Sequence, residues 1–524
     1  MLFNKNKNLY NLRKVWGKQT DKKRDLNLIS SYHRLLANKN PDDFVDKKTW
    51  EDLNFDSIFS KLDRNLTGIG QQYLYHLLHR YESNESLLKK RYELYVAFKD
   101  NSDLREKIQL ELLKIDENSS LYIAQLLLDK NLPNFKYYSL FYLFAFASIL
   151  SLFLIQFNGI FLFITIGILL INLIIHKINS SKIYSYFTGF SSLNSLLKAA
   201  INISQIKNAG SIDEIQNLIE KKIIIKSLKK KLGYLVIDKQ YQNELMIALI
   251  EYLNMFLLFD IIAYYRSVNV LLKNQNEIHD VMKSVAALDY AISIASFLTE
   301  MKSHSTPLFT DSAKISFEKL YHPLIEDAVT NSLQNISQSV LITGSNMAGK
   351  TTFIKTIGIN FIMAQTLYFV FANEFTIPKY VVKTSIRRND ELEEGKSYFF
   401  VEIETLKKFI DLSQGKKKYL YLIDEIFRGT NTVERLASST AVLKYLAASH
   451  KVFVTTHDIE LQDLLCSTFK MFHFSEQVED GKYFFDYRLQ HGVCSSGNAI
   501  KLLEIMNYPQ SITNEAKQIV KKIK

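Results

Sequence analysis

The chain has 524 residues, of which 47% are hydrophobic, and this length exceeds what a single core usually organises, so one small module is excluded. Lys and Arg outnumber Asp and Glu by 65 to 54, a net charge of +11 that favours a polyanionic partner such as nucleic acid or anionic lipid. The two cysteines, Cys466 and Cys494, lie in no metal-ligand spacing, which argues against a disulfide framework or a zinc site and fits a reducing cytosol.

The N-terminal half is predicted to be helical. Residues 1–26 are basic and lack the apolar run of a secretory signal, so we expect a retained basic tail, either solvated or in contact with headgroups or phosphates. Residues 27–136 follow with apolar side chains at helical spacing and almost no Pro or Gly. This second stretch is expected to form a helical region.

Residues 137–175 contain no charged side chain and are long enough for two helices of about 17 to 19 residues. A turn at residues 156–159 divides them. Because long runs that are apolar on every face are typical of membranes, we predict a two-span transmembrane hairpin, with burial in a soluble core as the alternative. The flanking basic residues place both ends in the cytoplasm: Lys130, Lys136, His176, Lys177 and Lys182.

Residues 176–304 return to helical periodicity. One segment places lysines on one face and Ile224, Ile225, Leu228 and Leu232 on the other, and the lysines form either a solvated face or a DNA or lipid surface: Lys222, Lys226, Lys229 and Lys230. A second apolar stretch, LIEYLNMFLLFDIIAYY, carries Glu251 and Asp260. We therefore predict one buried helix there rather than a third span.

After residue 305, short β-rich runs alternate with helices, which predicts an α/β domain with a largely parallel sheet. The run SVLIT leads into GSNMAGKTT, which completes the G-x-x-x-x-G-K-[ST] pattern of an ATP-binding P-loop. In such a loop, backbone N–H groups hold phosphates, Lys350 reaches the β and γ phosphates, and Thr351 binds Mg²⁺. The predicted ATP-binding residues are Gly344, Ser345, Asn346, Met347, Ala348, Gly349, Lys350, Thr351 and Thr352.

Two further strand ends carry candidate catalytic groups. The run YLYLID ends at Asp424, suited to the magnesium shell, and Glu425 follows it as the candidate general base that activates water. The run KVFVTT ends at His457, which is placed to sense the γ phosphate, with a structural histidine as the alternative. Together these residues predict a Mg²⁺-dependent ATPase.

The motifs GSNMAGKTT, RGTNT after the carboxylates, TTHD and RRNDELEEGKSYFFVEIETL together resemble the MutS family of DNA mismatch repair ATPases, within the ABC ATPase superfamily. The T-x-x-G step at Thr67 and Gly70 and the segment 284–298 resemble the family's helical core and lever. The resemblance implies a homodimer with composite ATP sites and DNA as a partner. It implies that Ser397 contacts the γ phosphate of the partner subunit, that Asn346 lines the phosphate loop, and that residues 428–432 link the two sites.

The chain also departs from this family. Phe427 replaces a common glycine, the sequence leaves no room for the family's N-terminal mismatch-reading domain, and the hairpin occupies part of the lever region, so ordinary mismatch recognition is not expected. The predicted fold class is α + α/β: residues 1–26 a tail, 27–136 a helical core, 137–175 a transmembrane hairpin, 176–304 a lever-like region and 305–524 an ABC-type ATPase domain.

We therefore expect a dimeric MutS-type ATPase anchored in the cytoplasmic membrane by two spans, with both termini and the ATPase domain in the cytoplasm. ATP is the only small-molecule substrate expected. An ABC-type transport ATPase is an alternative, although two short spans and the RGTNT motif argue against it. A membrane scaffold that uses ATP as a switch without nucleic acid is the other alternative.

Overall fold

The computed structural model describes residues 2–37, 43–129, 131–207, 209–232, 244–345, 348–386, 398–479, 482–493, 503–504, 506 and 508–523. The chain forms two compact units. The helical unit comprises Met1–Lys39, Leu62–His76 and Glu93–Glu300, and the sheet unit comprises Asn40–Lys61, Leu77–Tyr92 and Met301–Lys524. Two segments that the sequence assigned to the helical region, 40–61 and 77–92, therefore group with the sheet unit.

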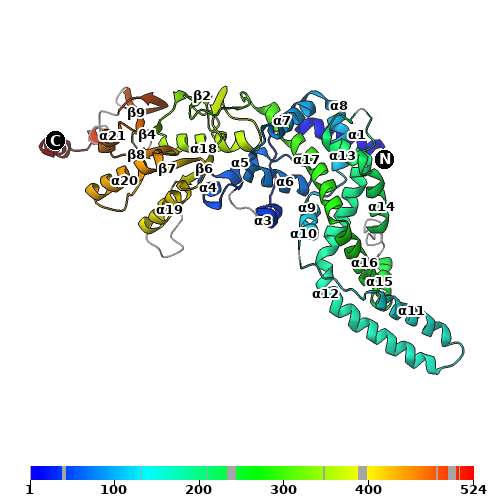
Figure 1. The fold of residues 1–524 in the computed structure, drawn as a ribbon. Helices are drawn as coiled ribbons and strands as arrows, with labels where there is room; N and C mark the ends of the chain where they lie inside the picture. Colours follow the sequence, from blue (N-terminus) through cyan, green and yellow to red (C-terminus); the bar gives the residue numbers. More distant parts are fainter. Residues whose placement is uncertain are drawn as a thin grey trace. The chain divides into compact units, whose positions relative to one another are not determined.

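The helical unit is built around two long helices, α12 (Ile160–Ile203) and α17 (Gln275–Glu300) (Figure 1). Both are long and apolar enough to cross a membrane, but the apolar part of α17 is 94% buried within the protein, whereas that of α12 is 17% buried. Helix α17 is therefore a core helix. The other helices are α1 (Leu2–Val15), α2 (Leu26–Ile29), α3 (Ser31–Ala37), α6 (Gly68–His79), α7 (Glu85–Asp100), α8 (Ser102–Leu112), α9 (Glu117–Ser120), α10 (Tyr122–Leu128), α11 (Ser139–Leu154), α13 (Asp213–Glu220), α14 (Lys222–Leu232), α15 (Glu244–Leu257) and α16 (Phe259–Lys273).

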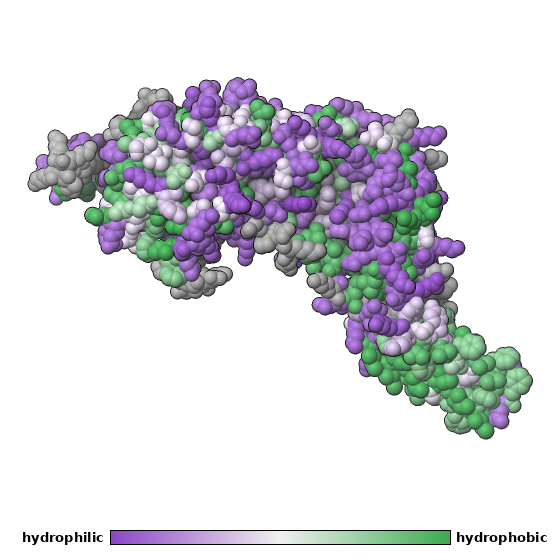
Figure 2. All heavy atoms as spheres, in the orientation of Figure 1, coloured by the Kyte–Doolittle hydropathy of each residue, from purple (hydrophilic) through white to green (hydrophobic). Residues whose placement is uncertain are grey.

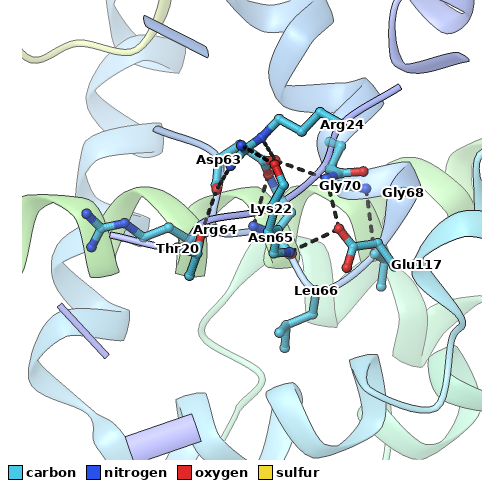
Figure 3. A network of polar contacts seen from close by, with 12 residues as sticks. Thr20, Lys22, Arg24, Asp63, Arg64, Asn65, Leu66, Gly68, Gly70 and Glu117 are labelled. Carbon is cyan, nitrogen blue, oxygen red and sulfur yellow. Dashed lines mark hydrogen bonds and ion pairs between the residues drawn. The ribbon is translucent and has the colours of Figure 1, made fainter. Parts of the chain in front are cut away.

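The N-terminal segment is folded against the helical unit, so the prediction of a separate tail over residues 1–26 is wrong (Figure 3). Helix α1 packs against α8. The Arg24 side chain donates from Nε to the fully buried Asp63 carboxylate at 2.8 Å. Lys22 bonds the carbonyl of Asn65 and the Glu117 carboxylate. Lys22 and Arg24 are thus held in place by carboxylates and carbonyls of the helical unit. The lysines of this segment that are exposed are Lys5, Lys7, Lys14, Lys18 and Lys23.

The T-x-x-G step lies against the core helix α17. Asp289 of α17 accepts hydrogen bonds from the backbone N–H groups of Leu66 and Thr67 and from the Thr67 hydroxyl, at 3.0, 2.9 and 2.6 Å. The Thr67 hydroxyl in turn accepts from the N–H of Gly70 at 3.1 Å. A Cβ at Gly70 would lie 2.2 Å from Asp289, so the step requires glycine there. Burial raises the pKa of Asp289 to about 6, against the effect of these hydrogen bonds.

The hairpin consists of α11 and the first part of α12, joined by a turn over residues 155–159. Its outward side chains are large and apolar, such as Phe157 and Phe163, which are 70% and 76% exposed. Figure 2 shows this end of the helical unit as a nearly unbroken hydrophobic surface. The predicted pair of apolar helices and the turn between them are present, and the side chains are not buried in a soluble core.

Two predictions for residues 176–304 need correction. On α14, Ile225, Leu228 and Leu232 are buried as expected, but Ile224 is exposed. The predicted single buried helix is two helices, α15 and α16, bent by 73° at Leu258, whose φ of +54° lies in the left-handed region. Residues on both sides of the bend are exposed, including Tyr252 and Phe259. The apolar composition alone did not indicate where helical hydrogen bonding would stop.

The sheet unit contains a six-stranded sheet in the order β10-β9-β4-β8-β7-β6, in which only β9 and β10 pair antiparallel. This confirms the predicted largely parallel α/β sheet. Its strands are β4 (Ser339–Thr343), β6 (Val381–Ser385), β7 (Tyr419–Asp424), β8 (Lys451–Thr456), β9 (Phe469–Glu479) and β10 (Lys482–His491). The central strands β4, β7 and β8 are buried almost throughout, as continuous apolar runs in parallel sheets are.

A smaller sheet has the strand order β1-β5-β2-β3: β1 (Leu308–Phe309), β2 (Ile315–Leu320), β3 (Asn331–Ile336) and β5 (Glu374–Ile377). The described helices of the sheet unit are α4 (Lys47–Asp52), α5 (Phe55–Leu62), α18 (Lys350–Thr366), α19 (Tyr398–Ser413), α20 (Thr432–Ala447), α21 (Glu460–Leu465) and α23 (Gln510–Ile523). Segment 40–61 joins the sheet through Asp52, which accepts from the Thr384 hydroxyl of β6 at 2.7 Å.

Candidate functional site

The loop between β4 and α18 contains two glycines in backbone conformations that favour glycine. Gly344 and Gly349 have φ angles of +140° and +93°, a region that favours glycine. A Cβ on Gly344 would lie 2.7 Å from the carbonyl oxygen of Phe474, and one on Gly349 would lie 3.0 Å from the Tyr487 ring. Gly349 is the N-cap of α18, so the N-terminus of a 17-residue helix faces this loop. Such an arrangement suits an anion.

Lys350 lies inside the loop that precedes it. Its Nζ donates to the carbonyl oxygens of Gly344 and Ser345, both at 2.7 Å, and lies 3.4 Å from Nδ1 of His457. The side chain is almost fully buried. A buried ammonium group at the start of this helix adds positive charge to the same place as the helix N-terminus.

The predicted metal ligands are adjacent. The Thr351 hydroxyl donates to Oδ2 of Asp424 at 2.8 Å, and the Thr455 hydroxyl donates to the other carboxylate oxygen. Within the described part of the chain no group of three or more His, Cys, Asp or Glu forms a metal cage. One hydroxyl and one carboxylate fit Mg²⁺, which is usually held by one or two protein oxygens, with water and substrate phosphate completing its shell.

Glu425 lies at the end of β7, beside His457, Arg428 and Lys350. Its carboxylate pairs with Nε2 of His457 and, at 2.5 Å, with Arg428, and Lys350 lies near. Burial raises the pKa of Glu425, but these contacts outweigh it and leave the pKa below its usual value. Its φ of +57° is uncommon for a residue with a side chain. An ionised carboxylate is therefore held at the loop in a strained backbone conformation.

His457 lies between the β4–α18 loop and Glu425. Its Nδ1 lies 3.0 Å from the carbonyl oxygen of Gly344, while its Nε2 faces Glu425. Nδ1 also lies 3.4 Å from Nζ of Lys350, so the ring contacts the loop, the lysine and the carboxylate together. The next residue, Asp458, holds Arg435 of α20 through two bonds of 2.8 and 2.7 Å. This pair fixes the strand end that carries the histidine.

A cavity of about 450 Å³ adjoins the loop. Gly349 and Thr352 line it, together with residues that include Tyr321, His322, Val329 and Tyr487. None of these four residues was among the predicted site residues, and Tyr487 lies on β10. Nothing in the local pattern of β10 marked that tyrosine, because it reaches the cavity only through the pairing of β9 with β4.

The structure therefore brings together Gly344, Gly349, Lys350, Thr351, Thr352, Asp424, Glu425 and His457. Ser345 and Ala348 lie in the same loop. Asn346, Met347 and Ser397 were also predicted to belong to the site, but they lie outside the described residues. Phe427, at the position of the common glycine, has a φ of +56° and donates its N–H to Glu402 at 2.5 Å. The glycine-like backbone is thus kept without the glycine.

Comparison with known proteins agrees with this geometry. Residues 340–524 match the family model MutS domain V. The chain is 32% identical over 253 residues to the DNA mismatch repair protein MutS of Lactobacillus acidophilus and 31% identical over 252 residues to that of Geobacillus sp.. It is 28% identical over 253 residues to that of Thermus thermophilus.

These matches cover 45–47% of this chain and 29–31% of the relatives. The chain thus matches less than a third of the length of these relatives. Residues 340–524, which carry the strands and the loop of the site, therefore resemble domain V of MutS proteins.

Proposed function

We propose that this protein binds and hydrolyses ATP at the site formed by the ends of β4, β7 and β8. One observation carries the proposal: a buried lysine, a hydroxyl–carboxylate pair and an ionised carboxylate converge on one glycine-bounded loop at a helix N-terminus. The adjoining cavity is large enough for a nucleoside, and Tyr487 and Val329 give it apolar walls.

Each residue has a distinct role in this proposal. The loop and Lys350 hold the β and γ phosphates of ATP. Thr351 and Asp424 hold Mg²⁺, which when bound would neutralise phosphate charge. Glu425 accepts a proton from the attacking water, and its pKa, held below the usual range, keeps it ionised for that task. His457 orients Glu425 and senses the γ phosphate.

The oligomer and nucleic-acid partners rest on the family. The matched relatives are named DNA mismatch repair proteins, so we propose a homodimer with composite ATP sites, in which Ser397 contacts the nucleotide of the partner subunit. We also propose that the protein acts on DNA, consistent with its net charge of +11. Lys226 and Lys230 of α14 are exposed and available for phosphate contacts.

The hairpin supports a membrane anchor. Its apolar side chains face outward, and a surface of this size is normally covered by a partner or by lipid. We propose that α11 and α12 insert into the cytoplasmic membrane with both termini and the sheet unit in the cytoplasm. The same exposed hairpin also favours a second candidate, an ATP-driven membrane scaffold that does not bind nucleic acid.

Mg²⁺-dependent phosphate release from ATP by the purified protein tests the proposal. Lys350→Ala should abolish nucleotide binding and hydrolysis together, because it removes the buried ammonium group of the loop. Lys444→Ala, which changes an exposed lysine on α20 of the same unit, is the matched control and should leave both unchanged. Undiminished hydrolysis by Lys350→Ala would place any ATPase activity elsewhere.

A further inference from the structure

The exposed apolar surface does not end with the hairpin. At the bend between α15 and α16, Tyr252, Leu253 and Phe259 are 57%, 40% and 50% exposed. Helix α15 contains only two charged residues, Glu244 and Glu251. A helix in the core of a soluble protein would bury these aromatic and aliphatic side chains. Their exposure beside an apolar hairpin indicates a surface that contacts a partner or lipid.

Helix α15 is attached to the hairpin. It packs against both α11 and α12. The buried Asn172 of α12 donates from Nδ2 to Oγ of Ser148 on α11 at 2.8 Å and to the carbonyl oxygen of Phe256 at 2.6 Å. Because the bend interrupts helical hydrogen bonding after α15, the Phe256 carbonyl needs a partner from elsewhere. Asn172 provides it, and so holds the C-terminal end of α15 at a defined level of the hairpin.

A polar cluster of His176, Tyr184 and Asp260 lies farther from the hairpin tip than Asn172 does. Asp260, directly after the bend, lies 3.0 Å from Nε2 of His176 and accepts from the Tyr184 hydroxyl at 3.2 Å. Ionisable groups avoid the hydrocarbon core, so this cluster belongs at its edge. Exposed tyrosines and lysines gather at the same end of the hairpin helices: Lys136, Tyr137, Tyr142, Lys177, Lys182 and Tyr184. Tyrosine and lysine at this position are typical of a membrane–water interface.

We propose that α15, with Phe259, lies in the headgroup region of the bilayer that the hairpin enters, as a third membrane element that does not span. This inference rests on the proposed membrane anchor. The 14 residues of α15 reach only about 21 Å, less than the roughly 30 Å of a hydrocarbon core. Its 73° bend from α16 and its exposed Glu251 suit a helix at the interface, with an apolar side on lipid and a polar side in water.

The bilayer fits this surface better than a second copy of the chain does. The surface is continuous with the uncharged hairpin, and lysines at its border match anionic headgroups. A protein interface would instead end in a polar rim on all sides. The hairpin side offers no such rim, because residues 137–175 hold no charge.

Depth-dependent quenching in vesicles tests the proposal with the full chain. In a Cys466→Ser, Cys494→Ser background, an environment-sensitive fluorophore is attached at Tyr252→Cys or Phe259→Cys. Leu143→Cys on the hairpin is the deep reference, and Val96→Cys, exposed on α7 of the helical unit, is the aqueous control. The vesicles contain phosphatidylcholine, a minority of phosphatidylglycerol, and lipid with a nitroxide near either the headgroup or the chain end.

We expect labels at 252 and 259 to be quenched at least about twofold more by the shallow nitroxide than by the deep one, as for an interfacial helix. The label at 143 should be quenched more by the deep nitroxide than by the shallow one. The label at 96 should be quenched by neither nitroxide. Quenching at 143 but not at 252 and 259 would overturn the interfacial helix and leave the hairpin anchor intact. Deep quenching at 252 would overturn it in favour of a spanning segment.

Loss of quenching at every position would refute the anchor itself, and this inference with it. The alternative of a second copy has its own signature. In detergent, a label at 252 that is protected from an aqueous quencher only as the protein concentration rises would show a protein interface there and overturn the lipid assignment.

Discussion

Replacing Arg24 by alanine should loosen the connection between the N-terminal segment and residues 62–67, which contact α17. Arg24 donates to the Asp63 carboxylate at 2.8 Å, to the Asp63 carbonyl at 3.0 Å and to the Lys22 carbonyl at 2.9 Å. Removing one partner of a buried ion pair costs about 3 to 5 kcal/mol, since the other charge stays buried. Asp63 keeps bonds from Asn65 and Gln71, so we expect the lower end, about 3 kcal/mol.

Hydrogen exchange of the full chain in detergent measures this loss. A cost of about 3 kcal/mol raises the local opening equilibrium about a hundredfold, so the amides of residues 62–67 should exchange about a hundredfold faster. The matched control is Arg13→Ala, which breaks the ion pair with Glu106 formed by an exposed arginine of α1. It should have little effect, because water screens exposed pairs. If Arg24→Ala accelerates exchange of these amides no more than Arg13→Ala does, the bonds of Arg24 do not stabilise residues 62–67, and the reasoning is refuted.

Further predictions concern the catalytic carboxylate, the hairpin and nucleic acid. Because the pKa of Glu425 is lowered, its carboxylate stays ionised as pH falls from neutral to about 5. The ATPase rate should therefore not fall over this pH range through protonation of Glu425. A fall in rate in this range whose midpoint moves in Glu425→Asp would contradict this. Deleting residues 137–175 should release the protein from membranes, and external thiol reagents should reach cysteines placed near Asn158 only; recovery of the intact chain without detergent would refute the anchor. DNA binding should weaken steeply with salt, without preference for a mismatch, and a mismatched duplex bound about tenfold more tightly would contradict this. The salt slope should fall on neutralising the α14 lysines if they contact phosphates: Lys222, Lys226, Lys229 and Lys230.

Much of the candidate site could be predicted because its signals are local. A strand that is buried on both faces is a continuous apolar run, so SVLIT, YLYLID and KVFVTT identified β4, β7 and β8. Parallel strands end at the same edge of a sheet, so the polar residues that follow them were expected to converge. The contacts of Lys350 with His457 and of Thr351 with Asp424 follow from that rule.

What depends on distant parts of the chain could not be predicted. The basic N-terminus looks like a tail because its partners, such as Asp63 and Glu117, lie far along the sequence. The bend at Leu258 has no glycine or proline to mark it, and is stabilised by Asn172 on another helix. Left-handed backbone at Glu425 and Phe427 is likewise invisible in the sequence, since both residues usually avoid it.

The proposed chemistry makes Glu425 essential for hydrolysis but not for binding. Single-turnover phosphate release with Mg²⁺, measured beside ATP affinity, compares the unaltered protein with Glu425→Gln and with Glu374→Gln, an exposed carboxylate on β5 of the same unit. The account predicts that Glu425→Gln binds ATP and hydrolyses it at least about a hundredfold more slowly, while Glu374→Gln behaves as the unaltered protein. Hydrolysis by Glu425→Gln at the unaltered rate would contradict the assignment of this site as the ATPase centre.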